Sequence, residues 1–166
     1  MSNDLPNRKL NRLKEYDYSI GGYYFVTICT LGKEHHFGRV ENEKMIKNNS
    51  GNIVENQWLW LHQKYQYVEL DYFVVMPNHF HGIIIIDASL KTSDVKTKSL
   101  SELIGAFKTT SSKLIHQAEL KNFRWQKSFY DRIIRNEIEL FKIRQYIQNN
   151  PLKWEIEKNN PSNIFM

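Results

Sequence analysis

The sequence predicts a single α+β domain in which helices pack against an antiparallel β-sheet. Its 166 residues, 41% of them hydrophobic, suffice for one packed core. Two runs rich in β-branched and aromatic residues flank a two-residue polar break, which is typical of a β-hairpin. Two further segments repeat their apolar residues at helical spacing. Helices set against antiparallel strands give an α+β sandwich.

The first half of the chain begins with a basic segment and continues into strands and a helix. Residues 1–15 contain few apolar side chains and four cations, so we expect a flexible or loosely docked basic arm formed around Arg8, Lys9, Arg12 and Lys14. A strand is predicted over residues 21–31, and a turn at 32–34 follows it. We expect a second short strand at 37–40 and an amphipathic helix at 50–65.

The middle of the chain contains the hairpin and a second helix. Residues 68–76 and 79–86 form the two runs around Pro77-Asn78. A polar, lysine-rich loop over 88–98 follows the hairpin. A helix is predicted from Leu100, with Ser99 and Glu102 as its capping box.

The C-terminal helix has the clearest boundaries in the sequence, and the segment at 124–129 before it is predicted to be extended or irregular. Asn136 is suited to cap the helix, with Glu139 completing a capping box. Pro151 is expected to end it. Its apolar stripe consists of Leu140, Ile143 and Ile147.

Charge and cysteine content limit the classes of function. A net charge of +5 and a pI near 9.2 suit a polyanionic partner, although many small proteins share this balance. Cys29 is the only cysteine, which excludes an intrachain disulfide and a multi-cysteine zinc site. The N-terminus lacks the apolar core of a signal peptide, and the longest apolar runs are strand-sized. We therefore expect a cytoplasmic protein with no membrane association.

Two histidines on the second hairpin strand are candidate metal ligands. His79 and His81 flank Phe80, and because side chains alternate along a strand the two imidazoles share one face. They would lie about 7 Å apart along the strand, close enough to converge on one ion. The alternative is a pair of ordinary half-buried histidines. The apolar run after His81 predicts a central strand, where paired polar side chains need partners.

Tyr146 and Asn150 lie four residues apart on the last predicted helix and therefore share a face. The Asn150 amide oxygen is a candidate third ligand for a divalent ion, and the Tyr146 hydroxyl is a candidate nucleophile toward a phosphodiester. Phenol has a pKa near 10, so it requires a cation or base beside it. Taken alone, Tyr146 is more simply interpreted as a packing residue. Its combination with His79 and His81 favours a role as nucleophile.

These residues lie in segments that resemble the single-tyrosine HUH transposases of the insertion-sequence-200-like family, and most closely the REP-associated tyrosine transposases. The resemblance runs from about residue 16 to 155. Its four ordered segments are Gly22-Tyr23-Tyr24-Phe25-Val26-Thr27, Met76-Pro77-Asn78-His79-Phe80-His81-Gly82-Ile83-Ile84, Phe107-Lys108-Thr109 and the stretch from Trp125 to Trp154 that includes Tyr146-Ile147-Gln148-Asn149-Asn150-Pro151. A His-x-His pair alone would be weak evidence, whereas four ordered matches are strong.

The resemblance implies a ferredoxin-like antiparallel sheet flanked by helices, and a DNA-cutting activity. In that scheme His79, His81 and Asn150 hold Mg²⁺ or Mn²⁺, and Tyr146 forms a 5′-phosphotyrosine with single-stranded or hairpin DNA. Imidazole ligands by themselves would favour Zn²⁺ or Mn²⁺ over Mg²⁺. The family includes dimers that exchange tyrosine helices and more self-contained members, so monomer and homodimer both remain open.

Several alternatives accompany this interpretation. Tyr130 is the rival nucleophile, although Ile134 stands where an amide would be needed four residues later. The main alternative function is a non-catalytic module that binds structured DNA with the same fold. Replication-initiator or relaxase nucleases are usually larger, and a small water-using hydrolase would not need the tyrosine.

DNA contacts are expected from cationic side chains in the second half of the chain. Any one of these residues taken singly is more simply interpreted as a solvated surface residue, but Lys108 and Arg135 lie in segments that match the family. The candidates are Lys108, Arg124, Lys127, Arg132 and Arg135.

Overall fold

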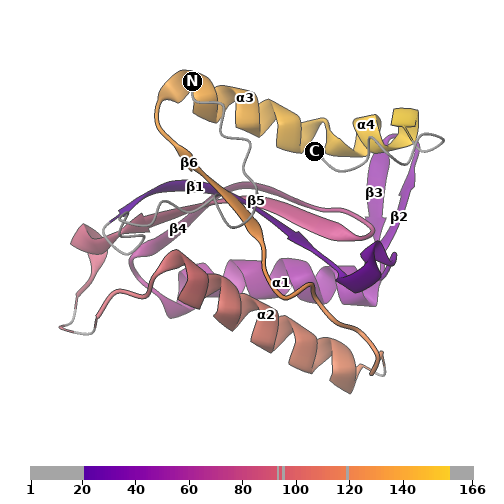
Figure 1. The fold of residues 1–166 in the computed structure, drawn as a ribbon, viewed down its shortest axis with the longest axis horizontal. Coiled ribbons are helices and arrows are strands. Elements are labelled where there is room, and N and C mark those ends of the chain that lie inside the picture. Colours follow the sequence, from indigo (N-terminus) through magenta and orange to yellow (C-terminus); the bar gives the residue numbers. More distant parts are fainter. Residues whose placement is uncertain (1–20, 93, 95, 119, 158–166) are drawn as a thin grey trace.

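A computed structural model describes residues 21–92, 94, 96–118 and 120–157 (Figure 1). The basic arm predicted over residues 1–15 lies outside this part of the chain. None of the described helices is long and apolar enough to cross a lipid bilayer.

The predicted helices and strands occur in the predicted order, and the structure contains several further elements. The strands are β1 (Gly21–Cys29), β2 (Gly38–Glu41), β3 (Lys44–Lys47), β4 (Val68–Val75), β5 (His79–Asp87) and β6 (Tyr130–Ile134). The helices are α1 (Asn49–Lys64), α2 (Leu100–Gln117), α3 (Glu137–Gln148) and α4 (Asn150–Glu157), with 3₁₀ turns η1 (Leu31–Lys33) and η2 (Ala88–Leu90).

The main sheet has the strand order β4-β5-β1-β6, and each neighbouring pair is antiparallel. Leaving aside the small β2-β3 sheet, the chain follows the path β1-α1-β4-β5-α2-β6, in which each helix connects two strands that are not neighbours. This is the ferredoxin-like arrangement, so the predicted α+β fold is confirmed. The strand with the two histidines, β5, has a neighbour on each side, as a central strand must.

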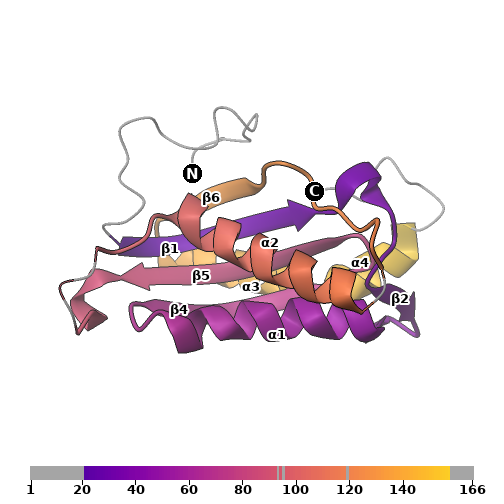
Figure 2. The ribbon, with the colours of Figure 1, turned by 90° about the horizontal axis from the view of Figure 1, so that it is seen from below.

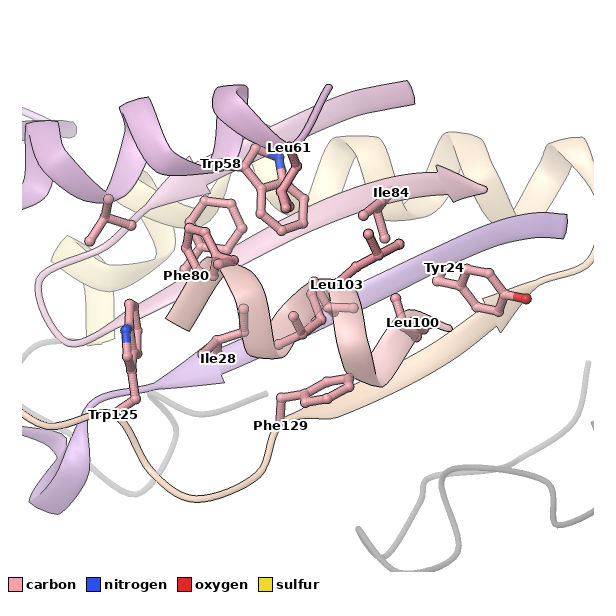
Figure 3. Close-up of a cluster of buried hydrophobic side chains, with 14 of the residues drawn as sticks. Tyr24, Ile28, Trp58, Leu61, Phe80, Ile84, Leu100, Leu103, Trp125 and Phe129 are labelled. Carbon is pink, nitrogen blue, oxygen red and sulfur yellow. The ribbon is translucent and has the colours of Figure 1, made fainter. Parts of the chain in front are cut away.

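Helices cover both faces of the sheet. α1 and α2 lie on one face, and α3 and α4 lie on the other (Figures 1 and 2). The larger hydrophobic core fills the space between the sheet and the first pair of helices, where the rings of Trp58 and Phe80 lie together (Figure 3). Phe107 packs against both of these rings. The opposite face has a smaller cluster around Ile83, Ile134 and Ile147. The candidate site lies on this second face.

The structure extends or corrects the predictions at several places, and the edge strand β6 (Tyr130–Ile134) is one element that was not predicted. The strand expected at 37–40 is one half of a hairpin whose second strand, β3, was not predicted. Asn136 caps α3 through Oδ1, which accepts from the Glu139 amide at 2.8 Å, but the Glu139 carboxylate binds the Arg135 amide and Arg132 instead of closing a capping box. The box at Ser99 and Glu102 is complete.

Pro151 does not end the helical region, and that prediction is wrong. α3 ends at Gln148, and α4 begins at once with Asn150. A proline fits the first turn of a helix, because its missing N–H would have no partner there. Pro151 therefore lies at the start of a new helix and not beyond the end of the old one.

Candidate active site

His79 and His81 lie side by side on the face of β5 that carries α3. Their ring centroids are 4.6 Å apart, and the two residues are only 2% and 1% exposed. Phe80 between them points into the larger core and packs on Trp58 with a centroid distance of 4.6 Å. The prediction that the two imidazoles share one face is confirmed.

Each imidazole is oriented by a hydrogen bond at Nδ1. His79 Nδ1 lies 2.7 Å from Asn78 Oδ1, and because an amide oxygen only accepts, His79 Nδ1 is the donor. His81 Nδ1 lies 2.8 Å from the hydroxyl of Thr27, its cross-strand partner on β1. With Thr27 as acceptor, both rings have the same tautomer and both Nε2 atoms carry a lone pair. Metal-binding histidines usually have this second hydrogen bond.

Tyr146 of α3 lies against the second histidine. Its ring meets that of His81 at a centroid distance of 5.3 Å and that of Phe25 edge-on at 6.1 Å. Phe25 in turn stacks on His81 at 5.4 Å. The three rings form one packed group, which fixes where the half-buried tyrosine lies relative to the histidine pair.

Asn150, the first residue of α4, connects the tyrosine to the first histidine. It is 6% exposed, and its Nδ2 donates to the backbone carbonyl of Tyr146 at 3.1 Å. Its side chain is also hydrogen-bonded to the His79 ring and to the Tyr146 side chain. Four residues from two distant segments therefore meet on one face of the sheet.

Burial sets the protonation states of these groups. Loss of solvation lowers the pKa of His79 to about 4, against the opposing effect of the hydrogen bond with Asn150. Burial and then the neighbouring His79 lower the pKa of His81 well below its ordinary value. Burial raises the pKa of Tyr146, and its hydrogen bond with Asn150 opposes this rise. At neutral pH both imidazoles are thus neutral, as metal ligation requires, and the phenol is protonated.

The donors of the site suit a single divalent ion. His79 and His81 offer imidazole nitrogen, and Asn150 offers an amide oxygen beside them. Within the described part of the chain no group of three or more His, Cys, Asp or Glu side chains is placed to hold a metal. Any ion here would rely on these two nitrogens and one neutral oxygen, with positions left for DNA or water.

Tyr130, the rival nucleophile, lies in the same row of the sheet. It pairs with Thr27 across β1 and β6, and Thr27 pairs with His81, so Tyr130 is two strands away from the histidine. The ring that contacts His81 is that of Tyr146, which also has the hydrogen bond to Asn150. Geometry therefore favours Tyr146.

The predicted DNA-contacting residues fall into two groups. Arg132 and Arg135 lie near the start of α3, where Arg132 forms an ion pair with Glu139 at 2.9 Å and Arg135 is exposed. Lys108, Arg124 and Lys127 line a groove of about 630 Å³ beside α2. The structure does not bring the two groups together.

The groove beside α2 is cationic. Lys113, which the sequence did not single out, lines it together with the three predicted cations, and none of the described residues along it is acidic. The ammonium of Lys108 donates to the carbonyls of Gln126 and Ser128 at 2.7 and 3.0 Å, so it also fixes the segment that forms one wall. Arg124 binds the carbonyl of Phe123 at 2.8 Å.

Sequence reasoning missed several residues that support the site. Asn78 is adjacent to His79 and could have been noticed as a side-chain acceptor. Thr27 carries no local signal, since only the strand register brings it to His81. Trp154, 6.0 Å from the His79 ring, and Lys153, 5.1 Å from the Tyr146 ring, lie beyond the proline at which the helix was expected to end.

The chain is similar to several known proteins. The family model described as "Transposase IS200 like" matches residues 39–150. A Haemophilus influenzae protein described only as uncharacterized is 36% identical over 165 residues, covering 91% of this chain and 92% of that protein. Among solved structures, a REP-associated tyrosine transposase bound to a REP hairpin is similar with a TM-score of 0.59 and 22% identity, covering 86% of this chain and 73% of the other. That likeness shows a shared fold.

Proposed function

The chain belongs to the IS200-like transposase family, and from this premise we propose that it cuts and rejoins single-stranded or hairpin DNA through a covalent bond between Tyr146 and a 5′-phosphate. The observation that supports this most directly is the convergence of Tyr146, His81 and Asn150. The tyrosine ring lies against His81 and its side chain is hydrogen-bonded to Asn150. This contact between two segments far apart in sequence supports the proposal that the tyrosine acts beside a metal held by the two histidines and Asn150.

The proposed step is an in-line transfer of phosphate. Tyr146 Oη attacks phosphorus, and the phosphorus–O3′ bond breaks. The 3′-oxygen leaves on the upstream DNA, while the 5′-phosphate of the downstream DNA becomes bonded to the tyrosine. The phenol proton is released, and the leaving 3′-oxygen gains a proton. Asn150 favours the deprotonated phenol, because its hydrogen bond lowers the pKa of Tyr146 against the effect of burial. Rejoining is the reverse reaction, with another 3′-hydroxyl as the attacking group.

His79, His81 and Asn150 would hold Mg²⁺ or Mn²⁺ beside the reacting phosphate. Such an ion polarises the phosphate and stabilises the charge that develops on it. Asn78 keeps His79 in the required tautomer, and the hydrogen bond with Thr27 orients the His81 ring. Burial keeps both rings neutral, so that no proton competes for Nε2 at neutral pH.

The DNA partner is proposed from charge and from the structural neighbour. That neighbour is bound to a REP hairpin, which makes hairpin DNA the first ligand to test. The cationic groove beside α2 offers Lys113, Arg124 and Lys127 to phosphates, and Arg132 and Arg135 offer a second cationic area near α3. Phosphate contacts of this kind predict binding that weakens as salt rises.

The test is covalent capture with end-labelled DNA. Hairpins copied from palindromes that flank the gene, each with single-stranded tails, are labelled at either the 5′ or the 3′ end and incubated with the protein and Mg²⁺ or Mn²⁺. We expect a denaturation-resistant protein–DNA adduct that contains the 3′ label alone, because the downstream fragment keeps the phosphate. A chelator should abolish the adduct.

Other outcomes separate the alternatives. Salt-sensitive hairpin binding with no adduct under any metal would support the non-catalytic DNA-binding module. Cutting without an adduct would indicate a hydrolase that uses water. An adduct that contains the 5′ label would mean that the opposite phosphate linkage forms, and the proposed chemistry would be wrong.

A further inference from the structure

Lys153 is a cation beside the candidate nucleophile that the proposed metal site does not use. It follows Asn150 by three residues on α4 and is half-buried. Its Nζ lies 5.1 Å from the centroid of the Tyr146 ring. Its charge is also close enough to lower the pKa of His81, after the larger effects of burial and of His79. The ammonium therefore lies near both Tyr146 and His81.

Within the described part of the chain, no ion pair balances the charge of Lys153. None of the ion pairs found among the described residues involves it. Glu157 lies four residues further along the same helix face, yet no ion pair joins the two side chains. Among the described residues the ammonium therefore has no acidic partner, so it can bind an anion that arrives in the functional state.

The anion that fits is the phosphodiester to be cut. Tyr146 Oη must come into contact with phosphorus, so the non-bridging oxygens of that phosphate will lie beside the tyrosine ring. Lys153 rests on the same ring, and its flexible four-carbon stem allows the ammonium to turn from the ring to these oxygens. Negative charge increases on them as Oη attacks, so a cation there acts most strongly in the transition state.

We infer that Lys153 binds the scissile phosphate beside Tyr146, in addition to the ligands His79, His81 and Asn150. This inference rests on the proposed function, since it names a further substrate-contacting residue for the same reaction. Lys153 therefore contacts substrate and is not needed for the stability of the fold. The break between α3 and α4 places Asn150 and Lys153, both on α4, next to Tyr146 near the end of α3.

The test removes charge from the protein and from the DNA in turn. Lys153→Met and Lys153→Arg are compared with Lys142→Met, which removes the same charge from an exposed position on α3. Once the wild-type adduct has located the cut, a second DNA is made with a neutral methylphosphonate at that linkage. Binding to both DNAs is measured in a Tyr146→Phe background, where no cutting occurs.

We expect Lys153→Met to slow single-turnover adduct formation by about 100-fold and Lys153→Arg by much less. Lys153→Met should weaken binding to the phosphodiester DNA by about tenfold and leave binding to the methylphosphonate DNA unchanged. A lysine that only supports the fold would affect both DNAs alike. That result, or an adduct rate equal to that of Lys142→Met, would overturn the inference while leaving the proposed function intact. Failure of the wild type to form any adduct would overturn both.

Discussion

Arg144 of α3 donates two hydrogen bonds to the carboxylate of Asp71 on β4, from Nε at 2.8 Å and from Nη2 at 2.5 Å. Asp71 lies at an irregularity of the β4–β5 pairing between Leu70 and Phe73, where the strand is locally released from its register. Arg144 precedes Tyr146 by two residues. The pair therefore fixes how α3 is rotated over the sheet, and with it where the Tyr146 side chain points.

Breaking this pair should affect both stability and activity. We expect Arg144→Met to lower the free energy of unfolding by about 1 kcal/mol, because the pair is partly exposed, and to reduce the rate of DNA adduct formation as well. Denaturant unfolding and single-turnover kinetics measure the two effects. Arg39→Met is the matched control, since its ion pair with Glu41 is largely exposed and should contribute at most a few tenths of a kcal/mol. Equal losses in the two variants would contradict this account.

The choice of nucleophile can be tested directly. Tyr146→Phe should eliminate the protein–DNA adduct and leave hairpin affinity nearly unchanged, because only one hydroxyl is lost. Tyr130→Phe should retain the adduct, since the ring in contact with His81 is that of Tyr146. Denaturing electrophoresis with labelled DNA distinguishes the variants. The opposite pattern would move the nucleophile to β6 without changing the family.

Metal affinity should depend on the three proposed ligands. His79→Ala should abolish binding of Mn²⁺ measured by titration calorimetry, and Asn150→Ala should weaken it by about 10- to 100-fold. Asn150→Asp should tighten it, because a carboxylate is a stronger ligand for a hard divalent ion than a neutral amide. His62→Ala, on the opposite side of the sheet, is the control. Unchanged Mn²⁺ affinity in His79→Ala would exclude this ligand set.

The low pKa of His79 makes the metal-free protein sensitive to acid. The unfolded chain takes up a proton near pH 6.5, whereas folded His79 does so only at about 4. His79 therefore does not lower the free energy of unfolding above pH 6.5. As the pH falls toward 4, protonation of the unfolded chain lowers this free energy by roughly 3 kcal/mol. Unfolding free energies measured against pH with a chelator present should show this slope. A His79→Gln variant should show less of it; an identical slope in both proteins would place the effect elsewhere.

Gly82, directly after His81, should not tolerate a side chain. A Cβ there would lie 2.8 Å from Phe80 Cε1 and 2.8 Å from Trp58 Cζ2, and both rings are fully buried. We expect Gly82→Ala to cost about 1–3 kcal/mol in unfolding free energy. Gly105→Ala, on α2 with nothing within 4 Å of the added carbon, should instead stabilise the protein by about 0.5–1 kcal/mol. An unfolding free energy of Gly82→Ala equal to or above that of the wild type would show that movement relieves the close approach at Gly82.

The parts of the fold that the sequence predicts are those encoded in local patterns. The alternation of His79, Phe80 and His81 identifies the face of each side chain before any tertiary contact is known. Likewise Ser99 and Glu102 predict a helix start that the structure confirms. Both signals need only a few adjacent residues, because strand alternation and capping are short-range effects.

The parts that escaped prediction depend on contacts between distant segments. β3 is a strand of only four residues, turned by Asn42 and Glu43 at positive φ, and its pattern is too short to be distinctive. The partnership of Thr27 with His81 follows from the register of β1 against β5. Pro151 was misread because a proline is compatible both with the end of one helix and with the first turn of the next.

All the groups of the candidate site lie on a single chain, since β5 supplies the histidines, α3 the tyrosine and α4 the amide and the lysine. In kinetic terms, the first cut is then expected to be first order in protein: diluting the chain at saturating DNA should leave unchanged the fraction of protein converted to adduct per minute. Each chain would also hold at most one DNA end at a time, because its nucleophile is occupied until rejoining. The yield of trapped adduct should therefore level off at one DNA fragment per protein molecule.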